Sequence, residues 1–471
     1  MLDKIGQFII DTAEVLCGYP LFFLLIGGGL YLFVSSGAVS LRRLPAAVRE
    51  LRTKPDGDAG NGQISSVQAL VSVVAATIGV GNIAGVAIAL VMGGPGAIFW
   101  MWVSALVGMS TKYHEGVLAI MHKGRDDQGR PQGGPMHIIV QGLGPKWSPL
   151  AKFFAVAGMF GTLSIMNSNQ LTEAFLATFT TPEGLESSAF LSSIGGFINF
   201  DNTATFRLLF GVAVAVIVGV VVVGGIQRIA NVATILVPFM VGLYFFMVMF
   251  IIVTHIEGVP GVFKSIFTEA FNLRAGFGAF AGIAIIGARR AALVNDAGIG
   301  TASIMHGASR NNNPVREGLI AMLGPSIDSG LVCTLSAIAI LLCGDINVSG
   351  VKGLEVATRT FASAVPAGDI LLICVIVCFA LSSMFSTSFY GTTCANYLFG
   401  CRRGRFYIWV FLVSLVVAAV VPIETAVAAC DLSYALMAIP TMTAVLALSP
   451  KVRRITSDYF KTKTRIQTQN S

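Results

Sequence analysis

Four residues weaken a helix within one long apolar stretch, residues 75–102. They are Gly79, Gly81, Asn82 and Gly85. A glycine in a helix costs about 1 kcal/mol relative to alanine, so this spacing predicts a break in the helix. An unwound turn within an apolar segment leaves N–H and C=O groups free, and such groups can bind an ion or a small charged molecule.

A second apolar stretch, residues 276–304, is also interrupted by glycines, among them Gly278 and Gly282. We expect a second break here, with free carbonyls around residues 278–282. These two glycines are equally compatible with close packing between helices, because small residues let two backbones approach.

The whole chain, which positions these two stretches, is predicted to fold as an all-α membrane protein with many transmembrane helices. It has 471 residues, of which 55% are hydrophobic and 12% are charged, and its mean hydropathy is +0.78. A soluble domain has about 25% charged residues, so much of this surface is expected to face lipid. The apolar runs do not alternate with polar residues as the strands of a membrane β-barrel would.

The net charge of +7 comes from Lys and Arg in short loops and in the C-terminal tail. This positive-inside pattern indicates orientation, and no nucleic-acid motif accompanies it. It predicts an N-terminus outside, a cytoplasmic C-terminus, and a cytoplasmic position for Arg289 and Arg290. About eleven transmembrane helices are predicted, near residues 19–36, 66–91, 96–120, 149–179, 206–224, 231–253, 276–304, 318–343, 369–399, 406–421 and 425–448.

Apart from the first helix, the ten that remain form two sets of five. Each set begins with a glycine-interrupted helix, and the two sets begin on opposite sides of the membrane. This pattern is typical of inverted-repeat transporters, whose site lies between the two interrupted helices. The predicted divisions are a peripheral helix and cytoplasmic loop (1–65), the first repeat (66–253), the second repeat with outer connections (254–448) and a basic cytoplasmic tail (449–471).

Two runs carry a resemblance to a known family. They are GVGNIAGVA at residues 79–87 and GGPGAIFWMW at residues 93–102. They resemble the signature of the alanine or glycine:cation symporters, also called sodium:alanine symporters, and weaker matches continue along nearly the whole chain. The resemblance implies the leucine-transporter fold and Na⁺- or H⁺-driven symport of a small neutral amino acid by alternating access.

The chain departs from the family pattern where substrate is expected. Asn167 stands where the family usually has Gln, Thr387 where it has Trp, Thr392 where it has Glu, and Asp296 where it has Glu. Two of these changes replace a larger group with a smaller one at positions expected to line the pocket. We therefore hypothesise a pocket wider than an alanine pocket.

The substrate site is expected at the two breaks. Free amides at the start of a half-helix suit a carboxylate, and the carbonyls near residues 278–282 would take the ammonium. By resemblance, an aromatic ring at Phe280 would wall the apolar part of the substrate. The predicted substrate-binding residues are Gly79, Val80, Gly81, Asn167, Asn169, Phe280, Gly282 and Thr387.

A Na⁺ site is expected from oxygen ligands alone. By analogy with the fold, it would use the carbonyls of Ala75 and Ile78 with the hydroxyls of Ser382 and Ser383. The alternative is that each hydroxyl bonds the carbonyl four residues earlier in its own helix. A less secure second site would use Thr77 and Asn82.

Ionisable side chains within apolar spans are costly and often functional. Asp328 is the best candidate for proton linkage, with a structural hydrogen-bond node as the alternative. Glu115 is expected to pair with Lys112. The eight cysteines show no metal-type CxxC spacing and are expected to be small buried hydrophobes.

These features predict a secondary transporter in the bacterial inner membrane and not an enzyme. There is no Walker motif, no Gly-x-Ser-x-Gly and no HExxH in the sequence. An H⁺-coupled transporter is the main alternative, followed by an ion channel or an intramembrane enzyme. We expect no cofactor besides Na⁺ or H⁺ as coupling ion, an amino-acid substrate, the lipid bilayer and no nucleic acid as partners, and a monomer sufficient for transport.

Overall fold

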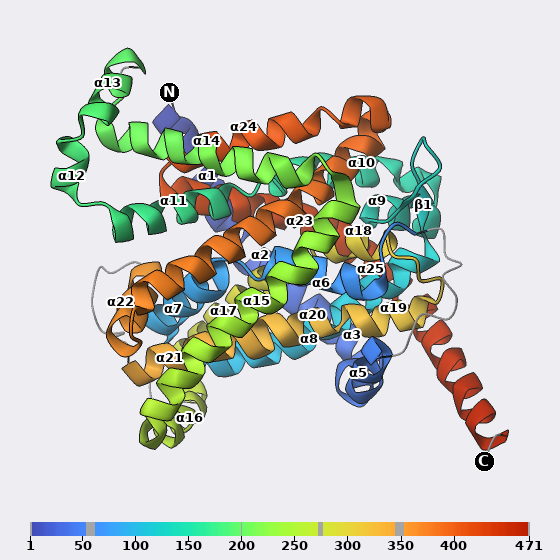
Figure 1. The fold of residues 1–471 in the computed structure, drawn as a ribbon. Helices are drawn as coiled ribbons and strands as arrows, with labels where there is room; N and C mark the ends of the chain where they lie inside the picture. Colours follow the sequence, from blue (N-terminus) through green and yellow to red (C-terminus); the bar gives the residue numbers. More distant parts are fainter. Residues whose placement is uncertain (1, 53–61, 199, 272–276, 344–352, 470–471) are drawn as a thin grey trace.

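The computed structural model describes residues 2–52, 62–198, 200–271, 277–343 and 353–469. Nearly all regular structure in these residues is helical, with one short two-stranded hairpin. Most of the long helices run across the molecule in roughly the same direction (Figure 1). The two ends of this bundle therefore correspond to the two sides of a membrane.

The N-terminal part is a bent helical pair. The segments Gly6–Leu16 and Tyr19–Ser35 meet at 44°. Two short helices then lead toward the first broken helix. The elements are α1 (Leu2–Leu16), α2 (Tyr19–Phe22), the π-helical turn η1 (Phe23–Gly27), α3 (Gly28–Ser35), α4 (Val39–Arg42) and α5 (Leu44–Arg52).

The first break lies where the glycines predict it. Helix α6 (Ser66–Thr77) and helix α7 (Gly81–Gly93) are bent by 48°. A capping box starts α6, in which the Ser65 hydroxyl accepts from the Gln68 backbone N–H. After α7, Gly94 adopts a φ of +65°, and helix α8 (Gly96–Met121) returns across the bundle.

The rest of the first half consists of a hairpin, short connections and three long helical segments. Strands β1 (Gly124–Arg125) and β2 (Pro131–Gln132) are antiparallel. The helical elements are α9 (Pro135–Ile138), η2 (Ile139–Leu143), η3 (Pro145–Trp147), α10 (Ser148–Gly161), α11 (Ile165–Phe179), α12 (Pro182–Glu186), α13 (Ala189–Ile198), α14 (Asn202–Val222) and α15 (Gly225–Thr254).

The second half begins with η4 (Ile256–Gly258) and α16 (Val259–Ala270), which precede a second broken helix, α17 (Phe277–Val294) and α18 (Thr301–Gly307). The remaining elements are α19 (Pro314–Ala321), α20 (Leu323–Pro325), the π-helical η6 (Ser326–Val332), α21 (Cys333–Cys343), α22 (Gly353–Ala364), α23 (Gly368–Gly404), α24 (Tyr407–Val420) and α25 (Ile423–Gln469).

The second break differs from its predicted position. Residues 277–282 are helical, so the carbonyls predicted to be free around residues 278–282 belong to the first turns of α17. The break lies instead between Val294 and Thr301. Its backbone enters the left-handed region at Asp296 (φ 52°), Gly298 (φ 88°) and Gly300 (φ 98°). Three such residues within five positions cannot belong to a right-handed helix.

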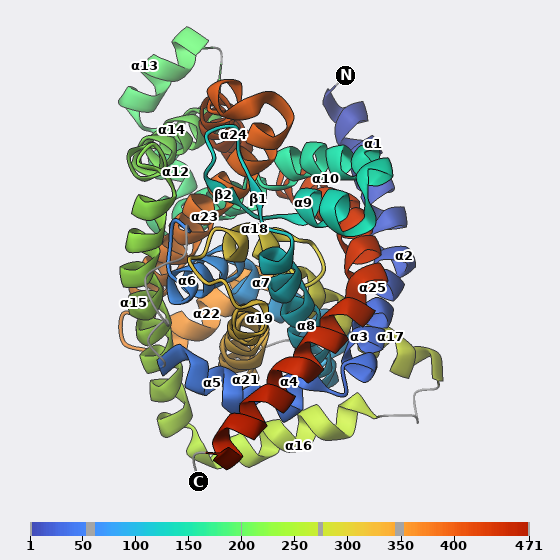
Figure 2. The ribbon, with the colours of Figure 1, turned by 90° about the vertical axis from the view of Figure 1, so that its right-hand side faces the viewer.

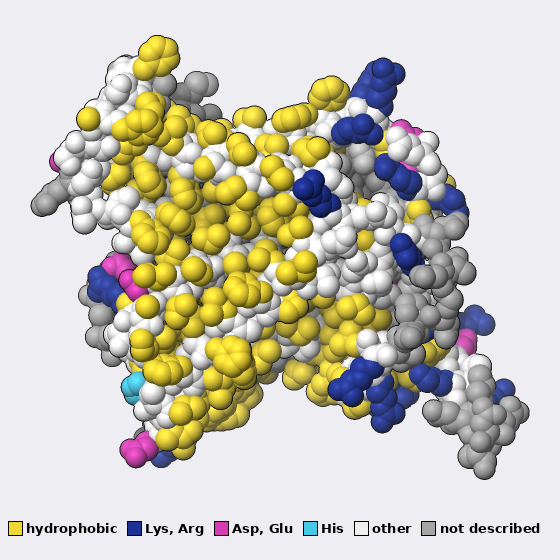
Figure 3. All heavy atoms as spheres, in the orientation of Figure 1, with side chains coloured by type: hydrophobic (Ala, Val, Ile, Leu, Met, Phe, Trp, Pro, Cys, Tyr) yellow, Lys and Arg dark blue, Asp and Glu magenta, His cyan; other side chains and the backbone are white. Residues whose placement is uncertain are grey.

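The surface agrees with a membrane protein. Among the described residues, six helices are long and apolar enough to cross a membrane, or eight if each of two bent pairs is one span. The predicted count of eleven would add α8, the pair α17 and α18, and α24. Apolar side chains cover the middle of the face in Figure 3, and Lys and Arg gather at its right-hand end.

Helix α8 is central to the packing and contacts α17, α18 and α19. Its contact with α17 is close because Gly287 has no side chain. A Cβ atom on Gly287 would lie 2.2 Å from the Ala97 carbonyl oxygen. Figure 2 looks onto the end of the bundle where Lys and Arg gather, and α25 crosses this end beside α3 and α4. The predicted basic tail is thus continuous with the last helix.

Candidate functional site

A small cavity lies beside the first helix break, with a volume of about 130 Å³. Pockets that hold drug-sized ligands span about 300–1,000 Å³, so this cavity suits a much smaller molecule. It is formed between α6, α7, α11, α17, α23 and α25. Its polar lining residues include Thr77, Asn82, Ser164, Asn167, Gln170, Arg290, Asp296, Ser383, Thr387, Asp431 and Tyr434.

Asn82 holds the first break in place. Its Oδ1 accepts a hydrogen bond from the Gly79 backbone N–H at 3.1 Å. The N–H groups of Val80 and Gly81 have no acceptor in the described parts of the chain. The predicted amide donors are therefore reduced to two, because the Gly79 donor is already used.

The side chain of Asn82 also reaches the second half of the chain. Its Nδ2 donates a hydrogen bond to Asp328 Oδ1, from η6. Asp328 is fully buried, and its Oδ2 has no hydrogen-bond partner within the described residues. A buried charge without a partner is costly, so this carboxyl group is suited either to face a cation or to carry a proton.

The second break is held by the first half in the same manner. The Gly298 backbone N–H donates to Glu115 Oε1, from α8, at 2.6 Å. The expected partner of Glu115 was Lys112, but Lys112 Nζ makes no hydrogen bond within the described residues. The prediction that Glu115 pairs directly with Lys112 is therefore wrong. The Gly298 N–H of the unwound backbone donates to Glu115 in place of the Lys112 ammonium.

The two serines predicted to bind Na⁺ lie against α6. The hydroxyl of Ser382 lies 3.3 Å from the Ala75 carbonyl oxygen and 3.0 Å from the Phe379 carbonyl oxygen. The hydroxyl of Ser383 donates to the Ala76 carbonyl oxygen at 2.8 Å. The structure thus brings Ala75, Ser382 and Ser383 together, next to the residue that ends α6, Ile78.

The predicted substrate-binding residues divide into two groups. Gly79, Gly81, Asn167 and Thr387 line the cavity. Asn167 Nδ2 donates to Ser383 Oγ at 3.0 Å, and the Thr387 hydroxyl lies 2.5 Å from the Ser164 hydroxyl. Asn167 and Thr387, two of the four residues that depart from the family pattern, are therefore both hydrogen-bonded across the α11–α23 contact.

The other predicted residues do not line the cavity. Val80 is fully buried beside the break. The Asn169 side chain points to α24 and donates to the Ala418 and Val421 carbonyl oxygens. Gly282 lies in α17 and is not among the described lining residues, and the side chain of Phe280 lies outside the part of the structure that is described.

Three charged side chains line the cavity, and of these only Asp296 was expected near the substrate. Arg290 comes from α17, Asp296 from the second break and Asp431 from α25. Arg290 was predicted at the cytoplasmic end of its helix, but the structure places it in the cavity wall together with two carboxylates. Its charge within an apolar span is the sequence signal that could have indicated this.

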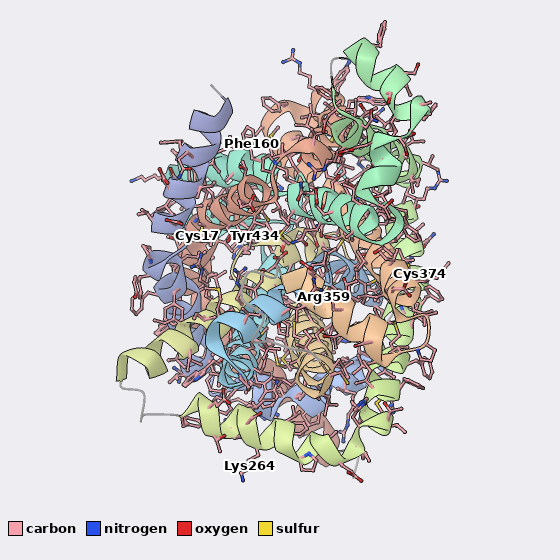
Figure 4. All side chains as sticks on the ribbon, turned by 90° about the vertical axis from the view of Figure 1, so that its left-hand side faces the viewer. Cys17, Phe160, Lys264, Arg359, Cys374 and Tyr434 are labelled. Atoms are coloured by element: carbon pink, nitrogen blue, oxygen red, sulfur yellow. The ribbon has the colours of Figure 1, made fainter. Side chains whose placement is uncertain are left out.

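Tyr434 comes from the same helix as Asp431 and also lines the cavity. It lies in the interior of the bundle, whereas Lys264 and Cys374 lie at its periphery (Figure 4). The cavity therefore combines one guanidinium, two carboxylates and the free backbone amide of Gly81. Such a set can bind both ends of a small zwitterion together with a cation.

Comparisons with known proteins agree with this arrangement. The model of the sodium:alanine symporter family matches residues 2–471. The sodium/alanine symporter AgcS of Methanococcus maripaludis is 34% identical over 435 residues, which cover 90% of this chain and 91% of that protein. The probable sodium/glutamine symporter GlnT of Bacillus subtilis is 29% identical over 467 residues, which cover 98% and 92%.

Among solved structures, MhsT in complex with L-phenylalanine matches with a TM-score of 0.51 and 13% identity, over 84% of this chain and 98% of that one. MhsT has the leucine-transporter fold, so this likeness supports that fold. The family match spans the chain and agrees with a cation-coupled amino-acid symporter. The protein is a transporter and not an enzyme, and it belongs to the sodium:alanine symporter family.

Proposed function

We propose that this protein carries a small neutral amino acid, of the alanine and glycine class, across the membrane together with Na⁺. The observation that carries the proposal is the cavity at the first helix break, which is lined by Gly81 with its unpaired N–H group, a guanidinium and two carboxylates. Its volume of about 130 Å³ fits a small substrate.

In this proposal the substrate carboxylate lies at the start of α7. Gly81 lines the cavity, its N–H group is unpaired among described residues, and the N-terminus of a helix favours an anion. The ammonium lies toward Asp296 or Asp431, whose carboxylates also line the cavity. Asn167 and Thr387 lie between these ends and contact the side chain of the substrate.

Two cation positions belong to this proposal. One is at the end of α6, where the Ser382 and Ser383 hydroxyls lie at the Ala75 and Ala76 carbonyl oxygens and Ile78 caps the helix. The other is at Asp328, whose free Oδ2 lies beside the Asn82 amide. Na⁺ needs oxygen ligands, and the second position adds a full negative charge to the predicted pair of Thr77 and Asn82.

Proton coupling is the second candidate. A carboxylate that is fully buried, as Asp328 is, can carry a proton instead of facing a cation. Relatives named as sodium symporters favour Na⁺. One of these names includes alanine and the other glutamine, so the family accommodates substrates of different size, in line with our hypothesis of a widened pocket.

The proposed architecture is a 5+5 inverted repeat with one extra N-terminal helix, which together make eleven transmembrane helices. In this proposal the N-terminus lies outside, and a single chain suffices to transport the substrate. The crosswise hydrogen bonds support the repeat. Asp328 from the second half holds the first break, and Glu115 from the first half holds the second.

Competition for uptake of radiolabelled alanine into proteoliposomes tests the substrate class. Alanine, glycine, serine, glutamine, leucine and aspartate would each be added in excess. We expect the small neutral amino acids to compete strongly and aspartate not to compete. Inhibition by glutamine or leucine would support the widened pocket, and strict preference for alanine and glycine would contradict it.

A further inference from the structure

A strongly basic hollow lies between the N-terminal helices and the C-terminal part of α25, and it shares no described lining residue with the cavity at the first break. Its volume is about 740 Å³. Five cationic side chains line it, and none of its described lining residues is a carboxylate. These five are Arg42, Arg43, Arg453, Lys461 and Arg465.

The walls of this hollow are fixed by specific contacts. The Tyr113 hydroxyl lies 2.7 Å from the Thr456 hydroxyl, which joins α8 to α25. The guanidinium of Arg43 lies 3.7 Å from the centre of the Phe460 ring. Lys463, further along α25, forms an ion pair with Glu50 at 3.2 Å. These contacts hold the end of α25 against α4 and α5. The walls of the hollow are therefore fixed in place.

Several cations of the hollow have no anionic partner. Arg42, Arg453 and Lys461 form no ion pair or side-chain hydrogen bond in the described structure. Hydroxyl groups of Ser35, Ser36 and Ser457 lie among them. Guanidinium groups beside hydroxyls match the geometry of a phosphate, because Arg donates two parallel hydrogen bonds to its oxygens.

Exposed apolar side chains of α3 border the hollow. A second hollow of about 450 Å³ adjoins it and shares Ser35, Arg453 and Lys461. It is bordered by Tyr31, which is 53% exposed on α3, and Val34 of the first hollow is 68% exposed on the same helix. A molecule with its anionic group among the arginines could thus lay its chains along α3. Basic pockets between membrane helices commonly bind lipid headgroups in this way.

We infer that this hollow binds the phosphate headgroup of an anionic phospholipid, with its acyl chains against α3. The site rests on the cavity, its five cations and the exposed face of α3, and it is independent of the proposed transport activity. A bound lipid would fasten α3 to the end of α25 at the membrane surface.

Native mass spectrometry of the purified full chain tests this inference, with phosphatidylglycerol as the probe and phosphatidylcholine as the neutral comparison. We expect one phosphatidylglycerol to bind with a preference of at least about tenfold over phosphatidylcholine. The variant Arg42→Gln/Arg43→Gln/Arg453→Gln should lose that preference. The charge-matched control Arg402→Gln/Arg403→Gln/Arg405→Gln changes exposed arginines outside the hollow and should retain it.

Thermal unfolding without lipid reports whether the triple variant is folded, and Lys461→Glu offers a milder change that should weaken binding in the same direction. Equal loss in the control variant, or equal binding of both lipids to the wild type, would overturn the inference. Displacement of phosphatidylglycerol by inorganic phosphate alone would also overturn it, because the site would then recognise a free anion rather than a lipid.

Discussion

The amide of Asn82 and the carboxylate of Asp328 join the first helix break to the opposite half of the chain. Asn82 donates to Asp328 through Nδ2 and accepts from the Gly79 N–H through Oδ1. Asp328 retains one buried oxygen without a partner among described residues. This contact links the backbone that would bind substrate to the carboxylate that would bind the coupling ion.

We expect the variant Asp328→Asn to weaken binding of the coupling ion more than the other variants do. It removes the negative charge while keeping an oxygen that can accept from Asn82. Uptake of alanine measured against Na⁺ concentration should show a KM for Na⁺ raised at least about tenfold, equivalent to about 1.4 kcal/mol. Glu257→Gln, which changes an exposed carboxylate, should leave the KM for Na⁺ unchanged. An unaltered Na⁺ dependence in Asp328→Asn would remove Asp328 from the ion site.

The variant Asn82→Ala is expected to abolish transport while leaving the protein folded. Alanine removes the cap on the Gly79 N–H and the hydrogen bond to Asp328 together. Radiolabelled uptake would be compared with size-exclusion elution and thermal unfolding of the same preparation. Uptake at the wild-type rate would show that Asn82 is not part of the site.

The variant Gly79→Ala tests whether the backbone break borders the substrate. A Cβ atom at this position would lie 3.0 Å from the Asn167 side-chain oxygen, at the cavity wall. We expect the KM for alanine to rise at least about tenfold. The matched control is Gly242→Ala in α15, where a Cβ atom meets nothing within 4 Å. A similar effect in both variants would contradict a site at the first break.

Glu115 is predicted to stabilise the second break. The variant Glu115→Ala leaves the buried Gly298 N–H without its acceptor, which costs about 1–3 kcal/mol of the free energy of unfolding. Glu115→Gln keeps an acceptor and should recover most of the loss. Thermal unfolding checks both against Glu14→Ala, an exposed change on α1. Equal stability of Glu115→Ala and wild type would contradict the role.

The hairpin of β1 and β2 is predicted to loosen from α23 at low pH. Burial raises the pKa of the Asp126 carboxyl, but hydrogen bonds from the Arg130 N–H and guanidinium outweigh burial and lower it. A lowered pKa means that the carboxylate stabilises the hairpin above the ordinary Asp pKa of about 3.9 and loses this effect as pH falls further.

Hydrogen exchange, corrected for its intrinsic pH dependence, measures this loosening in the loop amides that Asp126 holds. We expect constant protection from pH 7 to pH 5 and a decline below the ordinary pKa. Asp126→Asn should reduce protection already at pH 7. The control Asp458→Asn changes an exposed carboxylate of α25. If protection in Asp126→Asn equals that in the wild type, Asp126 does not hold the hairpin.

The first break was predictable from the sequence, and the second was misplaced for a physical reason. Gly79, Gly81 and Asn82 weaken a helix, and the Asn82 side chain accepts from the Gly79 N–H in the break, so their spacing alone points to a break. Gly278 and Gly282 weaken a helix without ending it, and α17 continues through them. The actual signal is the turn chemistry from Asn295 to Gly300, where Asp and Gly accept left-handed backbone.

The polar lining of the cavity was only partly predictable. Asn167, Thr387 and the glycines of the first break were expected to line it, and they do. Arg290 and Asp431 lie about 140 residues apart in sequence, and their shared place in the wall depends on how α17 packs beside α25. Loop-charge rules assign an arginine to a membrane surface, so they could not reveal a cation inside the bundle.

Alanine uptake into proteoliposomes with imposed ion gradients tests the central claim most directly. An inward Na⁺ gradient at equal pH should drive accumulation of alanine above its external concentration, and ionophore collapse of the gradient should abolish it. Asp328→Asn should show reduced accumulation in the same vesicles. Accumulation driven by a pH gradient in Na⁺-free medium, with no response to Na⁺, would contradict sodium-coupled symport.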